Sequence, residues 1–408
     1  MSILPFDYNT PHPPTLFAAG ILRGDPINVD PCSIRPSNAS GLFLANLTCP
    51  LRTPDGKDVQ RDGEENLVAV KVVEDDRTRV PRDGKREARL LAKLDHPNIL
   101  ALLNAYLTPP SPSSLSSTIK LFTPFYPLPL SSVLSSQAFT SSISGSATFS
   151  TLAHSLAFQL LSAVAHLHAQ DIAHRDINPN NVVLARSGRL ILLDFGIAVR
   201  KGGEKASEMH FEVGTGAHRA PELVFASRTY DAPAIDLWAL ATTLCEFFTP
   251  LETPPPLSPA SSVDIDDAWR HYRDDDESET EETLRRKTLF DGGASDFLLA
   301  GSIFRVLGTP TVETWPEAAH LPNFSRFTFS SFPPTPLILH LPHLDPSSPL
   351  EHILPSMLNI SASKRMSAKE AVEILQKEAE VILPESMGGG RAEDGRSLEE
   401  LLASMTPL

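Results

Sequence analysis

The first half of the chain alternates between short apolar runs and polar, turn-rich segments. The runs are rich in β-branched and aromatic residues, and they predict strands at 41–47, 66–73, 99–107 and 118–125. One helix is predicted over 84–94, because Ala88, Leu91 and Ala92 form an apolar stripe that ends before His96 and Pro97. This half therefore indicates a sheet accompanied by a single helix.

The second half of the chain is mostly helical in pattern. A long helix is predicted over 151–169, with apolar residues at Leu152, Leu156, Leu160, Val164 and Leu167. A loop at 171–181 follows, then two short strands at 181–184 and 190–193, and further helices. Strands with one helix followed by a helix-rich part predict an α+β fold of two lobes.

These patterns divide the chain into an extension, two lobes, an insert and a tail. We expect a Pro-rich N-terminal extension at 1–30, an N-lobe at 31–125, a C-lobe at 126–380 and a C-terminal tail at 381–408. The insert at 252–287 begins with prolines and carries ten acidic residues and two arginines between 264 and 282. Such a charge run is typical of disorder.

Composition narrows the classes of partner and compartment. With 50 acidic and 35 basic residues, the net charge of −15 disfavours nucleic acid or an anionic membrane as the main partner. Three scattered cysteines exclude a disulfide framework and favour a reducing compartment. The chain has neither a signal-like start nor a run of 18 apolar residues. We therefore expect a cytoplasmic or nuclear location and no membrane.

Several short motifs occur in one fixed order. Lys71 ends the strand motif Val-Ala-Val-Lys, and Glu87 lies on the predicted helix. The loop motif at 174–181 contains Asp176 and Asn181, and Asp194 opens an Asp-Phe-Gly motif after the next strand pair. Each motif alone is common, but the ordered set predicts ATP-dependent phosphoryl transfer, which relies on positioning and charge neutralisation.

Each of these residues has a role in that chemistry. Lys71 supplies a cation for the phosphates of ATP, and Glu87 would hold that cation by an ion pair. Asp194 and Asn181 offer the oxygen ligands that Mg²⁺ prefers. Asp176 can orient the acceptor hydroxyl and take its proton. The expected cofactors are therefore ATP and Mg²⁺.

With these motifs the chain resembles the eukaryotic protein kinases over roughly residues 30–375, which implies the two-lobed protein kinase fold. The segments 213–222, 230–238 and 303–316 resemble the cyclin-dependent-kinase branch. The motif at 174–181, together with Gly-Thr-Gly and Leu-Phe-Asp-Gly-Gly, is similar to fungal kinases that activate cyclin-dependent kinases. That resemblance implies a serine/threonine kinase that acts on another kinase without a cyclin, as a monomer. It also implies a structural ion pair between Glu222 and Arg365.

The glycine-rich loop of the family is almost absent. Aligning Gly41 with its third glycine places Pro36 and Asn38 at the first two positions. Pro36 has no amide to offer a phosphate, so weaker ATP binding is expected. Ala39 and Ser40 stand where relatives carry inhibitory hydroxyl residues, so that regulation is not expected.

Other departures concern the catalytic loop and its regulation. Asn178 replaces the family's lysine, so a contact to the γ-phosphate loses its charge. His210 stands where cyclin-dependent kinases have their activating threonine, which predicts activity without phosphorylation there, with Ser207 as an alternative site. The helix that bears Glu87 lacks the cyclin-docking signature, which favours a single-subunit enzyme.

The resemblance also implies a set of residues for the adenine ring. Thr123 would be the gatekeeper, Pro124 would offer only its carbonyl, and Tyr126 would donate its N–H to the adenine. Ala69 and Val183 would sandwich the adenine base. Gly41 and Phe43 complete the set of residues expected to bind ATP. Thr123 could equally be a plain core residue.

Two other functions stay open from the sequence. The chain could be a pseudokinase that keeps the fold and acts as a binding scaffold, as the eroded glycine loop and Asn178 favour. Alternatively, the acidic insert could carry the function as a scaffold.

Overall fold

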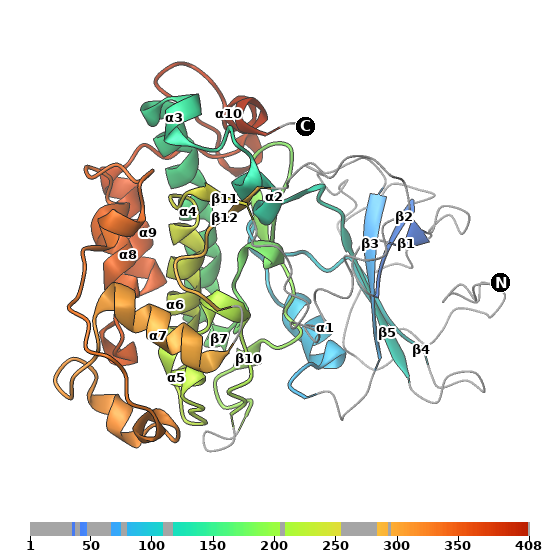
Figure 1. Cartoon of the computed structure of the whole chain (residues 1–408). Coiled ribbons are helices and arrows are strands. Elements are labelled where there is room, and N and C mark those ends of the chain that lie inside the picture. The colour runs from blue at the N-terminus through green and yellow to red at the C-terminus, as the bar shows by residue number, and fades with distance from the viewer. Residues whose placement is uncertain are drawn as a thin grey trace, which may run out of the picture.

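A five-stranded antiparallel sheet forms the first lobe of the computed structural model (Figure 1). Its strand order is β1-β2-β3-β5-β4. The strands are β1 (Arg35–Pro36), β2 (Leu42–Asn46), β3 (Leu67–Glu74), β4 (Asn104–Thr108) and β5 (Thr118–Pro124). The structure describes residues 35–36, 41–46, 67–74, 80–108, 117–204, 209–253, 284–292 and 295–406. The predicted extension at 1–30, the residues 37–40, Ser207 and most of the acidic insert lie outside these residues.

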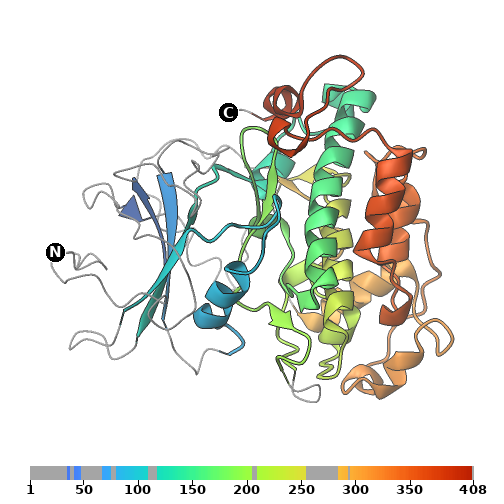
Figure 2. The ribbon, with the colours of Figure 1, turned by 180° about the vertical axis from the view of Figure 1, so that it is seen from behind.

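The helix α1 (Gly84–Leu91) lies between this sheet and the second lobe (Figures 1 and 2). Asp83 caps it by accepting a hydrogen bond from the backbone N–H of Arg86 at 3.0 Å. Its buried face contains Glu87, Ala88 and Leu91. The helix begins where the sequence predicts and ends three residues earlier.

The predicted strand at 99–107 is wrong in its first half. Only Asn104–Thr108 pairs within the sheet, whereas Ile99 forms a single parallel bridge to Leu192 of the second lobe. Asn98 is buried and donates to Gln159 and to the carbonyl of Leu190. These side-chain bonds fix the segment against the second lobe before the chain enters β4.

The second lobe is built around α4 (Ser146–Ala169), which begins five residues before the predicted helix. It contacts α6, α9 and α10, and Figure 2 shows it in the middle of the lobe. The other helices are α2 (Leu130–Ser135), α3 (Ser141–Ser144), α5 (Pro221–Val224), α6 (Ala232–Cys245), α7 (Asp296–Leu307), α8 (Leu350–Met357), α9 (Ala368–Glu378) and α10 (Leu398–Met405).

By length and composition, α4 is the one helix in the described part of the chain that could cross a membrane. Of its apolar window, 72% is buried inside the protein, so the packing of the lobe accounts for its composition. Short strands complete the lobe: β6 (Leu128–Pro129), β7 (Ile172–Ala173), β8 (Val182–Leu184), β9 (Leu190–Leu192), β10 (Val199–Arg200), β11 (Leu251–Glu252) and β12 (Arg285–Arg286).

The predicted disorder of the insert at 252–287 does not extend to its ends. Leu251–Glu252 and Arg285–Arg286 pair as antiparallel strands, so the chain leaves and re-enters the lobe at one place. Arg286 is buried and donates to the carbonyl of Leu134 at 2.7 Å and to the carbonyls of Thr249 and Phe139. A buried guanidinium requires such acceptors, which fixes the return strand.

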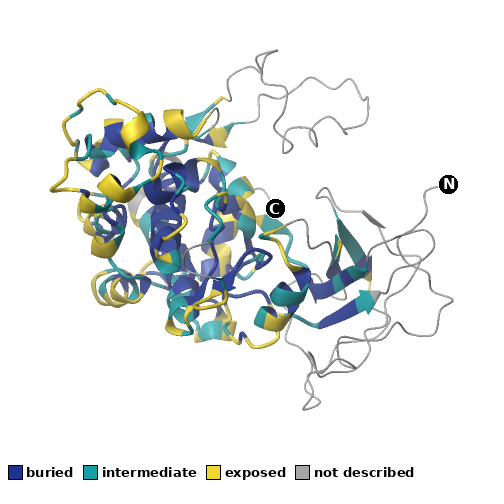
Figure 3. Cartoon of the chain, turned by 90° about the horizontal axis from the view of Figure 1, so that it is seen from below, coloured by how far each residue is buried: buried dark blue, intermediate teal, exposed yellow. Residues whose placement is uncertain are grey.

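The predicted C-terminal tail is folded as far as residue 406. Residues Leu398, Leu401, Leu402 and Met405 of α10 belong to the core of the second lobe. Burial is concentrated in that lobe (Figure 3). The predicted pair between Glu222 and Arg365 is confirmed: two hydrogen bonds of 2.7 and 2.8 Å join them in the interior.

Candidate active site

Three charged side chains meet between the lobes, as the sequence predicts. Lys71 lies on β3, Glu87 lies on α1, and Asp194 follows β9. The ammonium of Lys71 lies 2.8 Å from Glu87 Oε1 and 2.8 Å from Asp194 Oδ1. The first lobe therefore contributes a cation and an anion to this cluster, and the second lobe contributes a second anion.

The surroundings fix the charge states of this cluster. Burial by itself would lower the pKa of Lys71, but the carboxylates of Glu87 and Asp194 outweigh it and raise the pKa. Burial would likewise raise the pKa of Asp194, but Lys71 and Arg82 hold that pKa well below its ordinary value. A cation and an anion are thus present together at neutral pH.

The loop before β8 presents Asp176 to a small cavity. Its Oδ2 accepts from the amide of Asn181 at 2.9 Å. Its Oδ1 accepts from the hydroxyl of Thr215 at 2.6 Å and from the amide of Asn178 at 3.2 Å. The cavity has a volume of about 260 Å³ and is lined by Asp176, Thr215 and Arg82, among others. A hydroxyl at hydrogen-bonding distance from Asp176 is therefore compatible with this site.

Asp236 is a residue of the site to which sequence reasoning assigned no role. Its buried carboxylate accepts from the backbone N–H groups of His174 and Arg175, each at 2.7 Å. Arg175 has φ of +70°, a conformation that costs energy for a residue with a Cβ. The sequence did contain a signal for a special role of this residue, because Asp236 is the one acidic residue in the otherwise mostly apolar sequence of α6.

The residues present fit a divalent cation. The amide nitrogen of Asn181 donates to the backbone oxygen of Asp176 as well as to its carboxylate, which leaves the carbonyl oxygen of Asn181 as its ligand atom. The N–H of Leu193 donates to the backbone oxygen of Asn181 at 2.8 Å, which places Asn181 beside the residue before Asp194. In the described part of the chain no three His, Cys, Asp or Glu residues form a metal cluster. Mg²⁺ usually takes few protein ligands together with substrate phosphates.

A second charged cluster, also missed in the sequence, connects α1 to the activation segment, by which we mean the chain from Asp194 to Glu222. Both terminal guanidinium nitrogens of Arg175, Nη1 and Nη2, lie 2.8 Å from the carboxylate of Glu204. The same carboxylate accepts from Arg86 of α1 at 3.4 Å. Burial would raise the pKa of Glu204, but the hydrogen bonds and charge of Arg175 lower it. Since Arg175 is fully buried, Glu204 supplies the anion that it requires.

His210 lies next to this cluster, as its predicted alignment suggests. Its carbonyl accepts from the hydroxyl of Tyr230 at 2.6 Å, and Arg175 donates to that same hydroxyl at 3.2 Å. The contact between Arg175 and the activation segment is therefore made by a carboxylate of the chain itself.

The residues predicted to contact adenine come from the sheet and from the segments after it. On the sheet, Ala69 of β3 pairs with Thr123 of β5, and Phe43 packs against the small core of the first lobe. Gly41 directly precedes β2. The residues on the sheet are Phe43, Ala69, Thr123 and Pro124, and the residues beyond it are Tyr126 and Val183. Thr123 and Val183 are both buried. Their contacts with adenine stay a prediction.

Gly41 has a backbone reason to be glycine. Its φ is +70°, and an added Cβ would lie 2.9 Å from the carbonyl oxygen of Val72. Its own carbonyl accepts from the N–H of Val72 at 2.7 Å. Pro36 pairs opposite Phe43, so the hairpin of β1 and β2 forms even though the first glycine is replaced.

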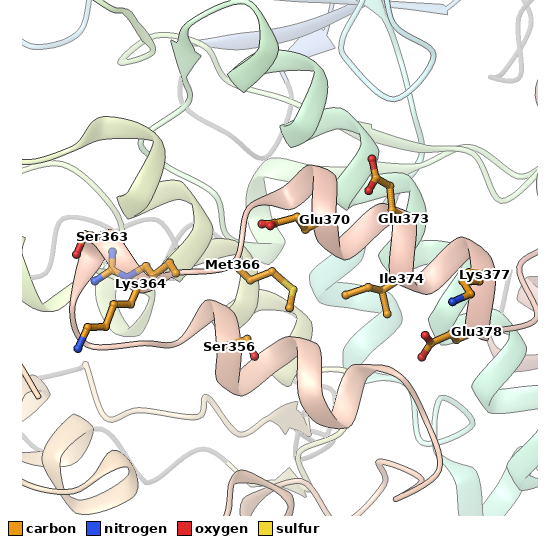
Figure 4. Close-up of a pocket in the computed structure, with 10 residues that line it drawn as sticks. Ser356, Ser363, Lys364, Met366, Glu370, Glu373, Ile374, Lys377 and Glu378 are labelled. Atoms are coloured by element: carbon orange, nitrogen blue, oxygen red, sulfur yellow. The ribbon is translucent and has the colours of Figure 1, made fainter.

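A larger groove, of about 540 Å³, lies on the second lobe at α8 and α9 (Figure 4). Lys364, Glu370, Glu373 and Lys377 give it a mixed charge. None of the charged residues between the lobes lines it. Of the charged motif residues between the lobes, Asp176 lines the smaller cavity instead.

Comparison with known proteins agrees with this geometry. The family described as "Protein kinase domain" matches residues 57–375. Cyclin-dependent kinase 7 of Xenopus laevis is 30% identical over 72% of this chain and 67% of its own length. Serine/threonine-protein kinase csk1 of Schizosaccharomyces pombe is 26% identical over 78% of this chain and 88% of its own length.

A solved structure with a similar fold is the yeast RNA Pol II CTD kinase CTDK-1 complex. The TM-score is 0.56 at 22% identity, covering 82% of this chain and 88% of that chain. This likeness concerns the fold alone. From the matched domain, the relatives and the geometry together, the chain belongs to the protein kinase family, as a serine/threonine kinase of the cyclin-dependent-kinase branch.

Proposed function

We propose that this kinase transfers the γ-phosphate of ATP to the activation segment of other kinases and works as a single chain without a cyclin. The observation that carries the catalytic part is the 2.6 Å contact between the hydroxyl of Thr215 and Asp176. Arg82 lines the same cavity and connects it to Asp194 of the charged cluster. The resemblance of the motif at 174–181 to kinases that act on kinases supports the substrate class.

In this proposal each residue acts on ATP or on the acceptor. Lys71 binds the phosphates of ATP, and Glu87 keeps its ammonium in position. Mg²⁺, held at Asp194 and Asn181, would neutralise phosphate charge. Asp176 orients the acceptor hydroxyl and takes its proton as the new phosphate bond forms. Asn178 and Asn181 hold Asp176 by hydrogen bonds.

Action without a cyclin is supported by the position of α1. In protein kinases the ion pair between this lysine and this glutamate must be in place for activity, and here Glu87 already pairs with Lys71 in the lone chain. Glu204 connects Arg86 of α1 to Arg175 of the catalytic loop. The same contact supports activity without phosphorylation of the activation segment, since a carboxylate already neutralises Arg175.

The test is phosphate transfer by the purified full chain alone to a panel of kinase activation-segment substrates. Asp176→Asn should lower the rate at least about 100-fold, the usual worth of a positioned base. Asp95→Asn, an exposed aspartate after α1, is the matched control and should keep the wild-type rate. Equal rates for Asp176→Asn and wild type would refute the catalytic role. A strict requirement for an added subunit would refute single-chain action.

A pseudokinase that binds partners without turnover is the second candidate function. Asn178 favours it, because the catalytic loop carries an amide where the family has a lysine. Pro36 favours it as well, since β1 offers no amide at that position. Transfer by the wild-type chain that Asp176→Asn abolishes would exclude this alternative.

A further inference from the structure

Arg82 reaches the charged cluster from the turn in front of α1. Its Nη1 lies 3.1 Å from Asp194 Oδ2, on the carboxylate oxygen that Lys71 does not contact. The backbone fixes this position, because the N–H of Asp83 donates to the carbonyl of Gly196 at 3.0 Å. The turn that carries Arg82 is therefore bonded directly to the Asp-Phe-Gly segment.

Without Arg82, the charged side chains that line the cavity at Asp176 in the described part of the chain are all negative. Among its described lining residues, Asp176 and Glu212 are acidic and Arg82 is basic. A phosphoryl group that approaches Asp176 brings further negative charge. Of the side chains that line the cavity in the described part of the chain, Arg82 alone can compensate for that charge.

The catalytic loop does not supply a second cation at this place. Asn178 stands where the resemblance predicts a lysine, and its amide donates to Asp176 while its side-chain oxygen accepts from the N–H of Asn180. Its polar atoms thus serve the loop itself. A positive side chain that faces the transferred γ-phosphate in this cavity must therefore come from an element other than the catalytic loop.

We propose that Arg82 contacts the γ-phosphate of bound ATP and supplies the positive charge that position 178 lacks. This inference rests on the proposed function, since it assigns a further residue to the same site. Asp194 would hold the metal ion when it is bound, and the guanidinium of Arg82, whose side chain is 54% exposed, could then turn from that carboxylate. The terminal phosphate is then the anion next to it, and the planar guanidinium fork suits phosphate oxygens.

The role is electrostatic and leaves the proton balance unchanged. The bond from phosphorus to the acceptor oxygen forms as its bond to the β-phosphate oxygen breaks, and ADP leaves with that electron pair. Asp176 takes the acceptor proton. Arg82 stays protonated throughout, because a guanidinium does not lose its proton at neutral pH.

Binding of two nucleotides tests this contact without using turnover. Calorimetry with Mg²⁺ compares a non-hydrolysable ATP analogue, which has a γ-phosphate, with ADP, which lacks one. Arg82→Ala should weaken binding of the analogue at least about tenfold, the worth of a hydrogen bond to a charged group, and leave the Kd of ADP within about twofold. Arg89→Ala, which changes an exposed arginine on the helix α1 that follows Arg82, is the matched control and should change neither Kd.

Rescue at position 178 gives the sharper result. Adding Asn178→Lys to Arg82→Ala should restore most of the lost affinity for the ATP analogue, because the lysine returns the missing charge. Arg82→Lys keeps the cation and should lose less than Arg82→Ala. Thermal melting of each variant verifies folding, and Arg82→Gln replaces Arg82→Ala if the latter melts early.

Three outcomes would overturn the inference. Unchanged affinity of Arg82→Ala for the analogue would remove the contact. Equal weakening for the analogue and ADP would make Arg82 a structural residue. Tighter binding of both nucleotides would make it a competitor of the metal at Asp194. If the wild type discriminates between the nucleotides through Arg82 but transfers no phosphate, the inference stands and the proposed function fails.

Discussion

Among the residues that the structure describes, the first lobe contains two small hydrophobic clusters, whereas the second contains one continuous core. One small cluster is formed around Val68, Val70 and Phe122, and the other around Ala88 and Ile119. The core of the second lobe runs through α4, α6 and α9 and reaches α10 at the end of the described chain. Burial of apolar surface therefore stabilises the second lobe far more than the first.

The helix α1 belongs to both regions and is fixed by charge. Ala88 packs in a small cluster of the first lobe, and Leu91 packs in the core of the second. On the same helix, Glu87 forms an ion pair with Lys71 and Arg86 forms one with Glu204. Stability and catalysis therefore depend on different contacts in this protein. Core and buried-pair changes in the second lobe should lower the free energy of unfolding, whereas charge changes at α1 should lower activity first.

The largest effect on stability is expected from the buried pair of the second lobe. Arg365→Met leaves the carboxylate of Glu222 buried without its partner, and should lower the free energy of unfolding by about 3–5 kcal/mol. Urea denaturation measures this loss. The double variant Arg365→Met/Glu222→Gln should recover part of it, because it removes the unpaired charge. A loss below about 1 kcal/mol for the single variant would contradict the importance of this pair.

A smaller effect on stability but a clear effect on activity is expected at Glu204. Glu204→Gln removes the anion between Arg175 and α1, and should lower kcat/KM at least about tenfold, since hydrogen bonds to charged groups are worth about 1.5–3 kcal/mol. Initial rates of phosphate transfer measure the change. Because the pKa of Glu204 is lowered, the wild-type contact is present above pH 4.5 and is lost only below that value.

A phosphatase experiment completes the test of Glu204. Treatment of the wild-type chain with a protein phosphatase should leave its rate unchanged, because the contact to Arg175 is made by a carboxylate. A wild-type rate in Glu204→Gln, or loss of the wild-type rate on dephosphorylation, would show that another group positions the activation segment.

The smallest effect comes from matched deletions of one methylene group in the two cores. Ile119 and Ile353 are both fully buried, one in a small cluster of the first lobe and one in the core of the second. Ile→Val changes of this kind cost about 0.5–1.5 kcal/mol. Ile353→Val should fall at the upper end, because a continuous core relaxes less around a void, and Ile119→Val at the lower end. The reverse order in chemical denaturation would contradict the comparison of the lobes.

Much of the fold followed from local patterns. The spacing of apolar residues at 42–46, 67–74 and 118–124 and in the central part of α4 is typical of the strands and the helix that form there. The strand predicted from Ile99 failed at its start because Asn98 bonds to Gln159, which lies 61 residues away in the sequence. The prediction of disorder failed at the ends of the insert, because the burial of Arg286 among carbonyl groups leaves no local signature in the sequence.

The sequence by itself determined which residue types are available for phosphoryl transfer, because Lys71, Glu87, Asp176 and Asp194 supply the cation and carboxylates that this reaction needs. Only the tertiary structure decided which ordinary charged residues support them. Glu204 meets Arg175 across 29 positions, and Arg82 meets Asp194 across 112. An acid or base on a loop looks solvated in the sequence, and its partner is chosen only when folding buries the opposite charge beside it.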